Sequence, residues 1–94
     1  MNIIWDDEKN SKLKKERNIS FEEIAVLILE QKYFDIIKHP KRPEQNIFVL
    51  PMKDYTFAVP FLLDRENNIV LKTAFPSRKF HKRYGEGNNE SKTR

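Results

Sequence analysis

One predicted helix, over residues 21–31, constrains the fold most, because the sequence marks both its start and the side that faces the core. Ser20 and Glu23 form an S-x-x-E capping box, and Ile19 and Ile24 occupy the hydrophobic staple positions on either side of it. Apolar residues then recur at spacings of three and four, at Phe21, Ile24, Ala25, Ile28 and Leu29. We expect this helix to supply the main helical part of the core.

The chain becomes strand-like after this helix. Four runs rich in β-branched and aromatic residues follow, separated by turn-forming segments, at 33–38, 46–50, 55–63 and 69–75. The alternation of Phe57, Val59 and Phe61 predicts one buried face of a strand. Pro60 interrupts the same run, and because proline has no N–H to donate, it predicts a sheet edge or a bulge at that point.

The N-terminal segments are shorter and more polar. Residues 2–5 predict an opening strand, and residues 6–17 predict a helix with acids in its first turn and Lys14, Lys15 and Arg17 near its end. Leu13 is the only apolar residue of that helix, so it can bury little surface. Because so little of this helix can be buried, we expect its basic residues to form a solvated face or, alternatively, a secondary surface that binds RNA or a protein partner.

A short helix is expected at the end of the domain, over residues 77–84, with Pro76 in its first turn and Gly85 as its stop. The order of elements predicts an α+β domain: a single antiparallel sheet of about four to five strands, two N-terminal helices packed on it and a short C-terminal helix. Residues 1–84 would form this one domain, and residues 85–94 a disordered polar tail.

Positive charge is concentrated near the end of the chain. Residues 71–94 carry seven Lys and Arg against two Glu, whereas residues 1–70 carry eleven basic and twelve acidic side chains. The basic residues of the last quarter are interleaved with Phe80, His81 and Tyr84. A basic patch beside aromatic and imidazole groups is typical of surfaces that bind phosphates, so nucleic acid is the leading partner.

Several classes of function are disfavoured. The chain has no cysteine, neither histidine has a second ligand at metal spacing, and both glycines lie in the polar tail, where they form no phosphate loop. We therefore expect no metal and no nucleotide cofactor. The N-terminus lacks the features of a signal peptide, and the longest apolar run, 24–29, is too short to cross a bilayer. We expect a cytoplasmic domain without a membrane partner.

Two stretches resemble a known family. The first reads Trp5-Asp6-x-x-Lys9-Asn10 and continues with the segment 17–23, Arg-Asn-Ile-Ser-Phe-Glu-Glu. The second is the segment 72–79, Lys-Thr-Ala-Phe-Pro-Ser-Arg-Lys, followed by Tyr84. Together, in this order and at this chain length, they resemble the BrnT family of toxins from bacterial type II toxin–antitoxin modules. Arg17 stands where the family usually has histidine and Asn18 where it has glycine. Asn18 tolerates the left-handed conformation, and because the histidine is absent, no catalytic role is carried over to Arg17.

The resemblance implies a RelE-like fold and a ribonuclease activity that stops translation. It also implies neutralisation by a small antitoxin with a ribbon-helix-helix DNA-binding part, so that operator DNA would be contacted only through the antitoxin. Metal-free RNA cleavage requires a base for the 2′-hydroxyl, an acid for the 5′-oxygen and cations for the charge that builds up on the phosphate.

Candidate catalytic residues are Arg78, for phosphate and transition-state charge, and His39 or His81, for proton transfer. The candidate RNA contacts are Arg42, Lys72, Lys79, Lys82, Arg83 and Tyr84. Structural readings stay open for four of the candidates. The ring of Tyr84 could serve helix packing, and His81 could likewise be structural. His39 could be a solvent-exposed loop residue, and Arg78 could pair with an acid of the first helix.

The leading hypothesis is a metal-independent endoribonuclease toxin. The alternative is a non-catalytic module that grips RNA or an acidic protein with the same basic surface. A third is a toxin whose active residues have drifted, leaving only antitoxin binding. The first two differ in geometry, since cleavage requires one of the two histidines to lie within about 3–7 Å of the guanidinium of Arg78.

Overall fold

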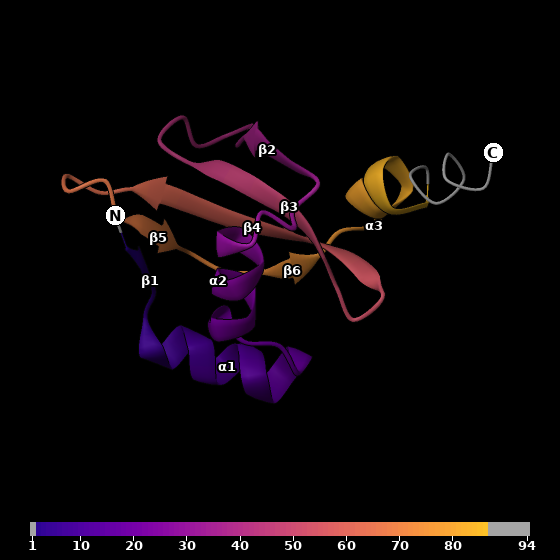
Figure 1. The fold of residues 1–94 in the computed structure, drawn as a ribbon, viewed down its shortest axis with the longest axis horizontal. Coiled ribbons are helices and arrows are strands. Elements are labelled where there is room, and N and C mark those ends of the chain that lie inside the picture. Colours follow the sequence, from indigo (N-terminus) through magenta and orange to yellow (C-terminus); the bar gives the residue numbers. More distant parts are fainter. Residues whose placement is uncertain (1, 87–94) are drawn as a thin grey trace.

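The computed structural model describes residues 2–86 of the 94-residue chain. Six strands, three helices and a π-helical turn follow one another in these residues (Figure 1). They are β1 (Ile3–Ile4), α1 (Asp7–Arg17), α2 (Phe21–Leu29), β2 (Asp35–Lys38), β3 (Asn46–Met52), β4 (Tyr55–Leu63), β5 (Ile69–Leu71), β6 (Phe75–Pro76), α3 (Arg78–Phe80) and η1 (His81–Glu86). The predicted α+β class is confirmed.

The sheet has the strand order β1-β5-β4-β3-β2, and β6 also pairs with β4. All pairs are antiparallel except β1 with β5, which run parallel with Ile3 opposite Ile69. The sheet is therefore mixed, and the prediction of a purely antiparallel sheet is wrong in this one pair. The cause is a contact distant in sequence: the N–H of Asn2 donates to the side chain of Asn68, and the N–H of Ile69 donates to the carbonyl of Asn2.

The last predicted strand is divided in two by a bulge. Phe61 pairs with Leu71 and Ala58 with Phe75. Residues 59 and 60 of β4 therefore lie opposite three residues, 72–74, of the neighbouring segment. Pro60 lies at this point, and its carbonyl accepts from the N–H of Lys72. Because the N and C=O of one strand residue point to the same neighbour, the proline nitrogen faces the bulged segment and has no hydrogen to offer it. The bulge expected at Pro60 is thus present, on the opposing segment.

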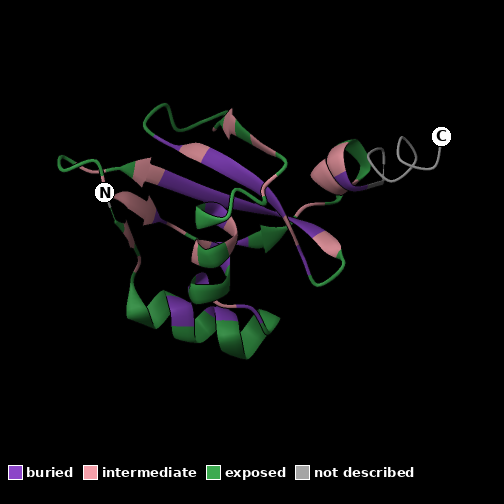
Figure 2. Ribbon diagram, viewed as in Figure 1, coloured by how far each residue is buried: buried purple, intermediate pink, exposed green. Residues whose placement is uncertain are grey.

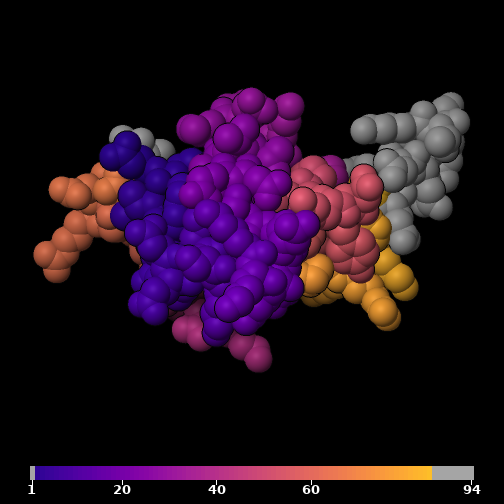
Figure 3. Space-filling view, turned by 90° about the horizontal axis from the view of Figure 1, so that it is seen from below, coloured from indigo at the N-terminus to yellow at the C-terminus, as the bar shows by residue number. Residues whose placement is uncertain are grey.

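The core lies mainly between the sheet and the two N-terminal helices, which cover one face of the sheet (Figures 1 and 3). Most buried residues of this layer come from α2, β3, β4 and β5, and α1 adds Leu13. They include Phe21, Ile24, Phe48, Leu50, Phe57, Val59, Phe61 and Leu71. As Figure 2 shows, burial is concentrated along the central strands. The predicted burial of the alternating residues of β4 is confirmed.

A smaller apolar layer occupies the other face. Val49 and Ala58 are buried there, and Phe80 and Tyr84 of the C-terminal helical segment pack against them. The helices therefore lie on both faces of the sheet. Pro76 belongs to β6 and not to a helix, and Ser77 is the N-cap of α3, with its hydroxyl accepting from the N–H of Phe80.

The helical segment continues past the predicted stop at Tyr84, because Gly85 is buried within η1. A Cβ at this position would lie 2.6 Å from Nδ1 of His81 and 2.8 Å from the hydroxyl of Thr56. Only glycine allows this close approach. Residues 87–94 of the predicted tail lie outside the described residues.

The connection between α1 and α2 is fixed by side chains. The capping box is present: the hydroxyl of Ser20 accepts from the N–H of Glu23, and the carboxylate of Glu23 accepts from the N–H of Ser20. Asn18 is left-handed at φ 56°, as its residue type predicts. Asn10, which is buried, accepts from the N–H of Phe21 at 2.7 Å. Its amide also donates to Glu22 at 2.8 Å, so one side chain joins α1 to the first turn of α2.

Replacing Asn10 should destabilise the domain. Asn10→Ala leaves the buried N–H of Phe21 without an acceptor, and we expect a loss of about 1–3 kcal/mol in the free energy of unfolding. The matched control is Ser11→Ala on the exposed side of the same helix, which should change stability by less than about 0.5 kcal/mol. Urea unfolding of the three proteins measures both values. Equal stability of the Asn10→Ala variant and the parent would contradict the proposed role.

Candidate nucleic-acid interface

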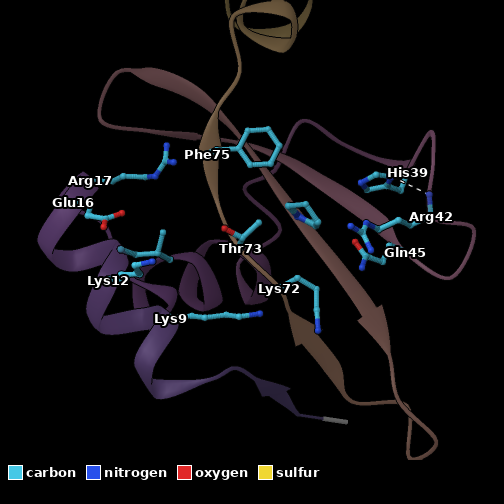
Figure 4. Close-up of a pocket in the computed structure, with 12 residues that line it drawn as sticks. Lys9, Lys12, Glu16, Arg17, His39, Arg42, Gln45, Lys72, Thr73 and Phe75 are labelled. Carbon is cyan, nitrogen blue, oxygen red and sulfur yellow. Dashed lines mark hydrogen bonds between the residues drawn. The ribbon is translucent and has the colours of Figure 1, made fainter.

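A groove of about 510 Å³ lies beside the bulge, between α1 and the loop that joins β2 to β3 (Figure 4). One wall is α1, the other is the loop between β2 and β3, and the segment 72–75 runs between them. Three residues that the sequence predicts as functional line this groove: His39, Arg42 and Lys72.

The α1 wall carries a charged stripe. Lys9, Lys12, Glu16 and Arg17 line the groove. Lys9, Glu16 and Arg17 lie three or four positions from Leu13, and Lys12 lies three from Lys9 and four from Glu16, so these residues share one side of the helix. Leu13 is buried and orients this side toward the sheet. Of the cations that the sequence predicts as a solvated face, three therefore line the groove. Lys14, which does not line it, lies 3.7 Å from Glu22.

The bulge determines which side chains of the segment 72–75 enter the groove. Leu71 and Ala74 are both buried in the core, three positions apart, whereas a regular strand would place them on opposite faces. Lys72, Thr73 and Phe75 are therefore left to line the groove. The missing N–H of Pro60 thus leads to a cluster of three groove residues on four consecutive positions.

The loop wall is held in shape by His39. Its Nδ1 lies 3.1 Å from the backbone N of Lys41 and 3.1 Å from that of Arg42, so it accepts from both N–H groups. The N–H of His39 donates to the carbonyl of Gln45, and the N–H of Gln45 donates to the carbonyl of Arg42. An accepting Nδ1 requires the neutral ring to carry its proton on Nε2. His39 thus offers the groove a hydrogen-bond donor, while its accepting nitrogen is used by the loop.

The groove is strongly cationic. Five of its lining residues are Lys or Arg, and Glu16 is its one carboxylate. Within residues 2–86, ion pairs within 4.0 Å join Lys14 to Glu22 and Lys32 to Glu30, so none of the five groove cations is paired. Unpaired like charges gathered along a hollow produce a positive potential that attracts an extended anion.

The C-terminal basic residues lie elsewhere. Arg78, Lys79, Lys82 and Arg83 are exposed on α3 and η1, outside the lining of the groove. The structure therefore does not gather the predicted site residues into one hollow. His39, Arg42 and Lys72 come together, and Arg78 is separate from them.

His81 belongs to a second hollow, lined also by Asp54, Tyr55 and Thr56. Its Nδ1 lies 3.0 Å from the hydroxyl of Thr56, and its ring stacks on Tyr55 with 4.1 Å between centroids. The two histidines thus line different hollows. A scheme in which they act together on one phosphate has no support in this arrangement.

Tyr84 serves the packing of the C-terminal helical segment. Its hydroxyl donates to Asp35 at 2.8 Å, its ring stacks on Phe34, and Arg83 lies over it at 5.7 Å. The hydrogen bond to Asp35 is the main cause that raises the pKa of Tyr84 above its ordinary value of 10.0, and desolvation adds to it. Of the two readings open for this residue, helix packing is the one with observed contacts.

Tyr84→Phe should lower stability at neutral pH by about 1 kcal/mol, because Asp35 loses its donor. A phenol whose pKa is raised by folding stabilises the folded state below the unfolded pKa of 10.0, and this contribution is lost as the pH rises through the higher folded value. Unfolding measured from pH 7 to pH 11 should therefore show the difference between the parent and the variant shrinking. Tyr33→Phe is the control, and a pH-independent difference would contradict the assignment.

His39→Ala should loosen the loop, because the N–H groups of Lys41 and Arg42 lose their acceptor. His39→Asn should preserve the loop, since an asparagine side chain accepts from backbone N–H groups two residues further on. Amide hydrogen exchange of Lys41 and Arg42 distinguishes the variants: fast in His39→Ala, and slow in His39→Asn and the parent. Equal protection in all three would show that the ring does not hold the loop.

The described residues contain no group of three His, Asp or Glu side chains that could hold a metal ion, and no helix among them is long and apolar enough to span a bilayer. Comparisons of the chain with protein-family models, with curated proteins and with solved structures find no match. The resemblance to BrnT toxins therefore rests on the two quoted motifs alone.

Proposed function

We propose that the protein binds RNA along the cationic groove and, as the toxin of a type II toxin–antitoxin module, cuts the bound strand without a metal ion. The observation that carries the proposal is the presence of five unpaired cations, from α1, the β2–β3 loop and Lys72, around one hollow. An RNA strand presents one negative charge per nucleotide, so it suits cations contributed by three separate parts of the fold. The setting would be the cytoplasm.

Cleavage would proceed by attack of the 2′-oxygen on the adjacent phosphorus, with the hydroxyl proton passing to water, and by breakage of the bond to the 5′-oxygen, which takes up a proton from water. The products are a 2′,3′-cyclic phosphate and a 5′-hydroxyl. Arg42 and Lys72, which line the groove, would stabilise the charge that develops on the phosphate, and His39 would offer its Nε2–H to the same groove. Preorganised donors of this kind are commonly the largest single contribution to such a reaction.

A second function, RNA binding without cleavage, is favoured by one specific observation. Nδ1 of His39 already accepts two backbone N–H groups, so the ring can exchange protons with substrate only if the loop releases it. The same groove would then hold RNA and leave it intact. The two functions use the same binding surface and differ only in whether the bound RNA is cleaved.

The antitoxin of such a module would compete with RNA for the groove. A segment that covers the site must therefore offer carboxylates to the five cations, and its ribbon-helix-helix part would carry all contact with operator DNA. The exposed cations of α3 and η1 would remain available for a second contact with either partner.

Two double variants locate the RNA. Arg42→Ala with Lys72→Ala removes two cations from the groove, and Lys79→Ala with Lys82→Ala removes two from the C-terminal helical segment. We expect the groove variant to bind single-stranded RNA at least about tenfold more weakly. Its slope of log affinity against log salt should fall by about 0.7 for each lost phosphate contact, and the C-terminal variant should keep the parental slope. The reverse result would place RNA on the C-terminal segment.

End analysis of RNA incubated with the protein and a chelator separates the two functions. A cleaving toxin yields 2′,3′-cyclic phosphate ends, and Lys72→Ala should reduce the rate at saturating RNA by about a hundredfold or more. Arg78→Ala serves as the comparison, since its site lies outside the groove. Intact RNA in the presence of tight binding would overturn the toxin assignment and leave the binding module.

A further inference from the structure

One aromatic side chain of the groove is partly exposed and has no aromatic partner. Apart from Phe57 and Phe75, every aromatic residue of the chain, all of which lie in the described part, packs against another ring. Phe57 is buried in the core, whereas Phe75 is 38% exposed. The other exposed phenylalanine, Phe34, is stacked on Tyr84. Phe75 is therefore the one exposed ring among residues 2–86 without a ring partner.

Phe75 is held at a defined place among the groove cations. It lies in β6, paired with Ala58 of the central strand β4, and two residues later the N–H of Ser77 donates to the carbonyl of Thr56. The backbone beneath the ring is thus fixed by the sheet. In Figure 4 the ring lies between the α1 wall with Arg17 and the loop wall with His39, above the segment that carries Lys72.

We propose that Phe75 is a platform on which a base of the bound strand stacks, so that the groove selects single-stranded RNA. The proposal rests on the RNA-binding function argued above and adds to it a contact with bases. Proteins that bind single strands without strong sequence preference combine a cationic groove with aromatic rings, because every base has a face that can stack. In a duplex those faces are covered by neighbouring base pairs, so the ring favours unpaired nucleotides.

The arrangement on the two sides of the ring supports this role. Arg17 and Lys12 lie toward one wall and Arg42 toward the other, so phosphates on both sides of a stacked base would find cations. A single exposed apolar residue on a protein surface requires no explanation by itself. Here the ring shares a hollow with five unpaired cations and one carboxylate, and an acidic strand would occupy that hollow. A purely apolar partner would leave those cations uncompensated.

The test compares two labelled strands of about ten nucleotides, a length within the range bound by single domains of this kind. One is oligoadenylate RNA, and the other is an abasic strand with the same number of phosphates. Fluorescence anisotropy at one salt concentration measures the affinity of the parent, Phe75→Ala, Phe75→Leu and Phe75→Trp. Leu29→Ala, on the exposed side of α2 away from the groove, is the control for loss of a surface apolar side chain.

We expect Phe75→Ala and Phe75→Leu to bind oligoadenylate about tenfold to a hundredfold more weakly than the parent. Phe75→Trp should restore binding, and all variants should bind the abasic strand with parental affinity. Because Phe75→Leu keeps an apolar side chain of similar bulk, it reports on the aromatic face even if Phe75→Ala folds poorly. The preference of the parent for a single strand over a duplex of equal length should shrink in Phe75→Leu.

Two results would overturn the proposal while leaving the RNA function in place. One is parental affinity of Phe75→Leu for oligoadenylate, and the other is an equal loss of affinity for both strands. If the parent protein binds neither strand, the RNA function itself is wrong. If Phe75→Leu leaves RNA binding intact but abolishes binding of an acidic peptide partner, the ring is an anchor for a protein and not for a base.

Discussion

The absence of one hydrogen atom, on the backbone nitrogen of Pro60, shapes the candidate site. Pro60 lies in the central strand β4 and can accept from Lys72 but cannot donate in return. The neighbouring segment accommodates this with an extra residue, which divides it into β5 and β6. The extra residue reverses the alternation of side chains, so that Ala74 returns to the core and Phe75 faces the groove. The missing N–H of one residue therefore affects which side chains of the segment 72–75 line the groove.

The opposing wall depends on a comparably small set of contacts. α1 buries only Asn10 and Leu13, yet these two residues fix its rotation. Asn10 holds the helix to the start of α2, and Leu13 enters the core. Once the rotation is fixed, every third or fourth residue on the adjoining side points at the segment 72–75. A very polar helix thus acts as a wall of the groove, with little apolar burial of its own.

Local signals in the sequence predicted much of the fold. The capping box at Ser20, the left-handed Asn18 and the irregularity at Pro60 each follow from the chemistry of one or two residues, and each is present. The parallel pairing of β1 could not be predicted in this way, because it depends on Asn2 meeting Asn68 across most of the chain. The groove was missed for a related reason. Along the sequence, basic residues are densest in the C-terminal segment, whereas the cations of the groove come from three segments that are distant in sequence. The spacing of Lys9 and Arg17 around Leu13 was the available signal.

The pairing of β1 with β5 also affects the order in which the strands join the sheet while the chain is being synthesised. α1 and α2 are linked by contacts between residues about a dozen positions apart, such as those of Asn10 with Phe21 and Glu22. These contacts can form as soon as both helices have been synthesised. β1 has no partner until a segment 66 positions further along has left the ribosome. Closing so long a loop is entropically slow compared with forming local contacts. β1 is therefore among the last strands to join the sheet, and until then the edge of β5 that it covers stays open.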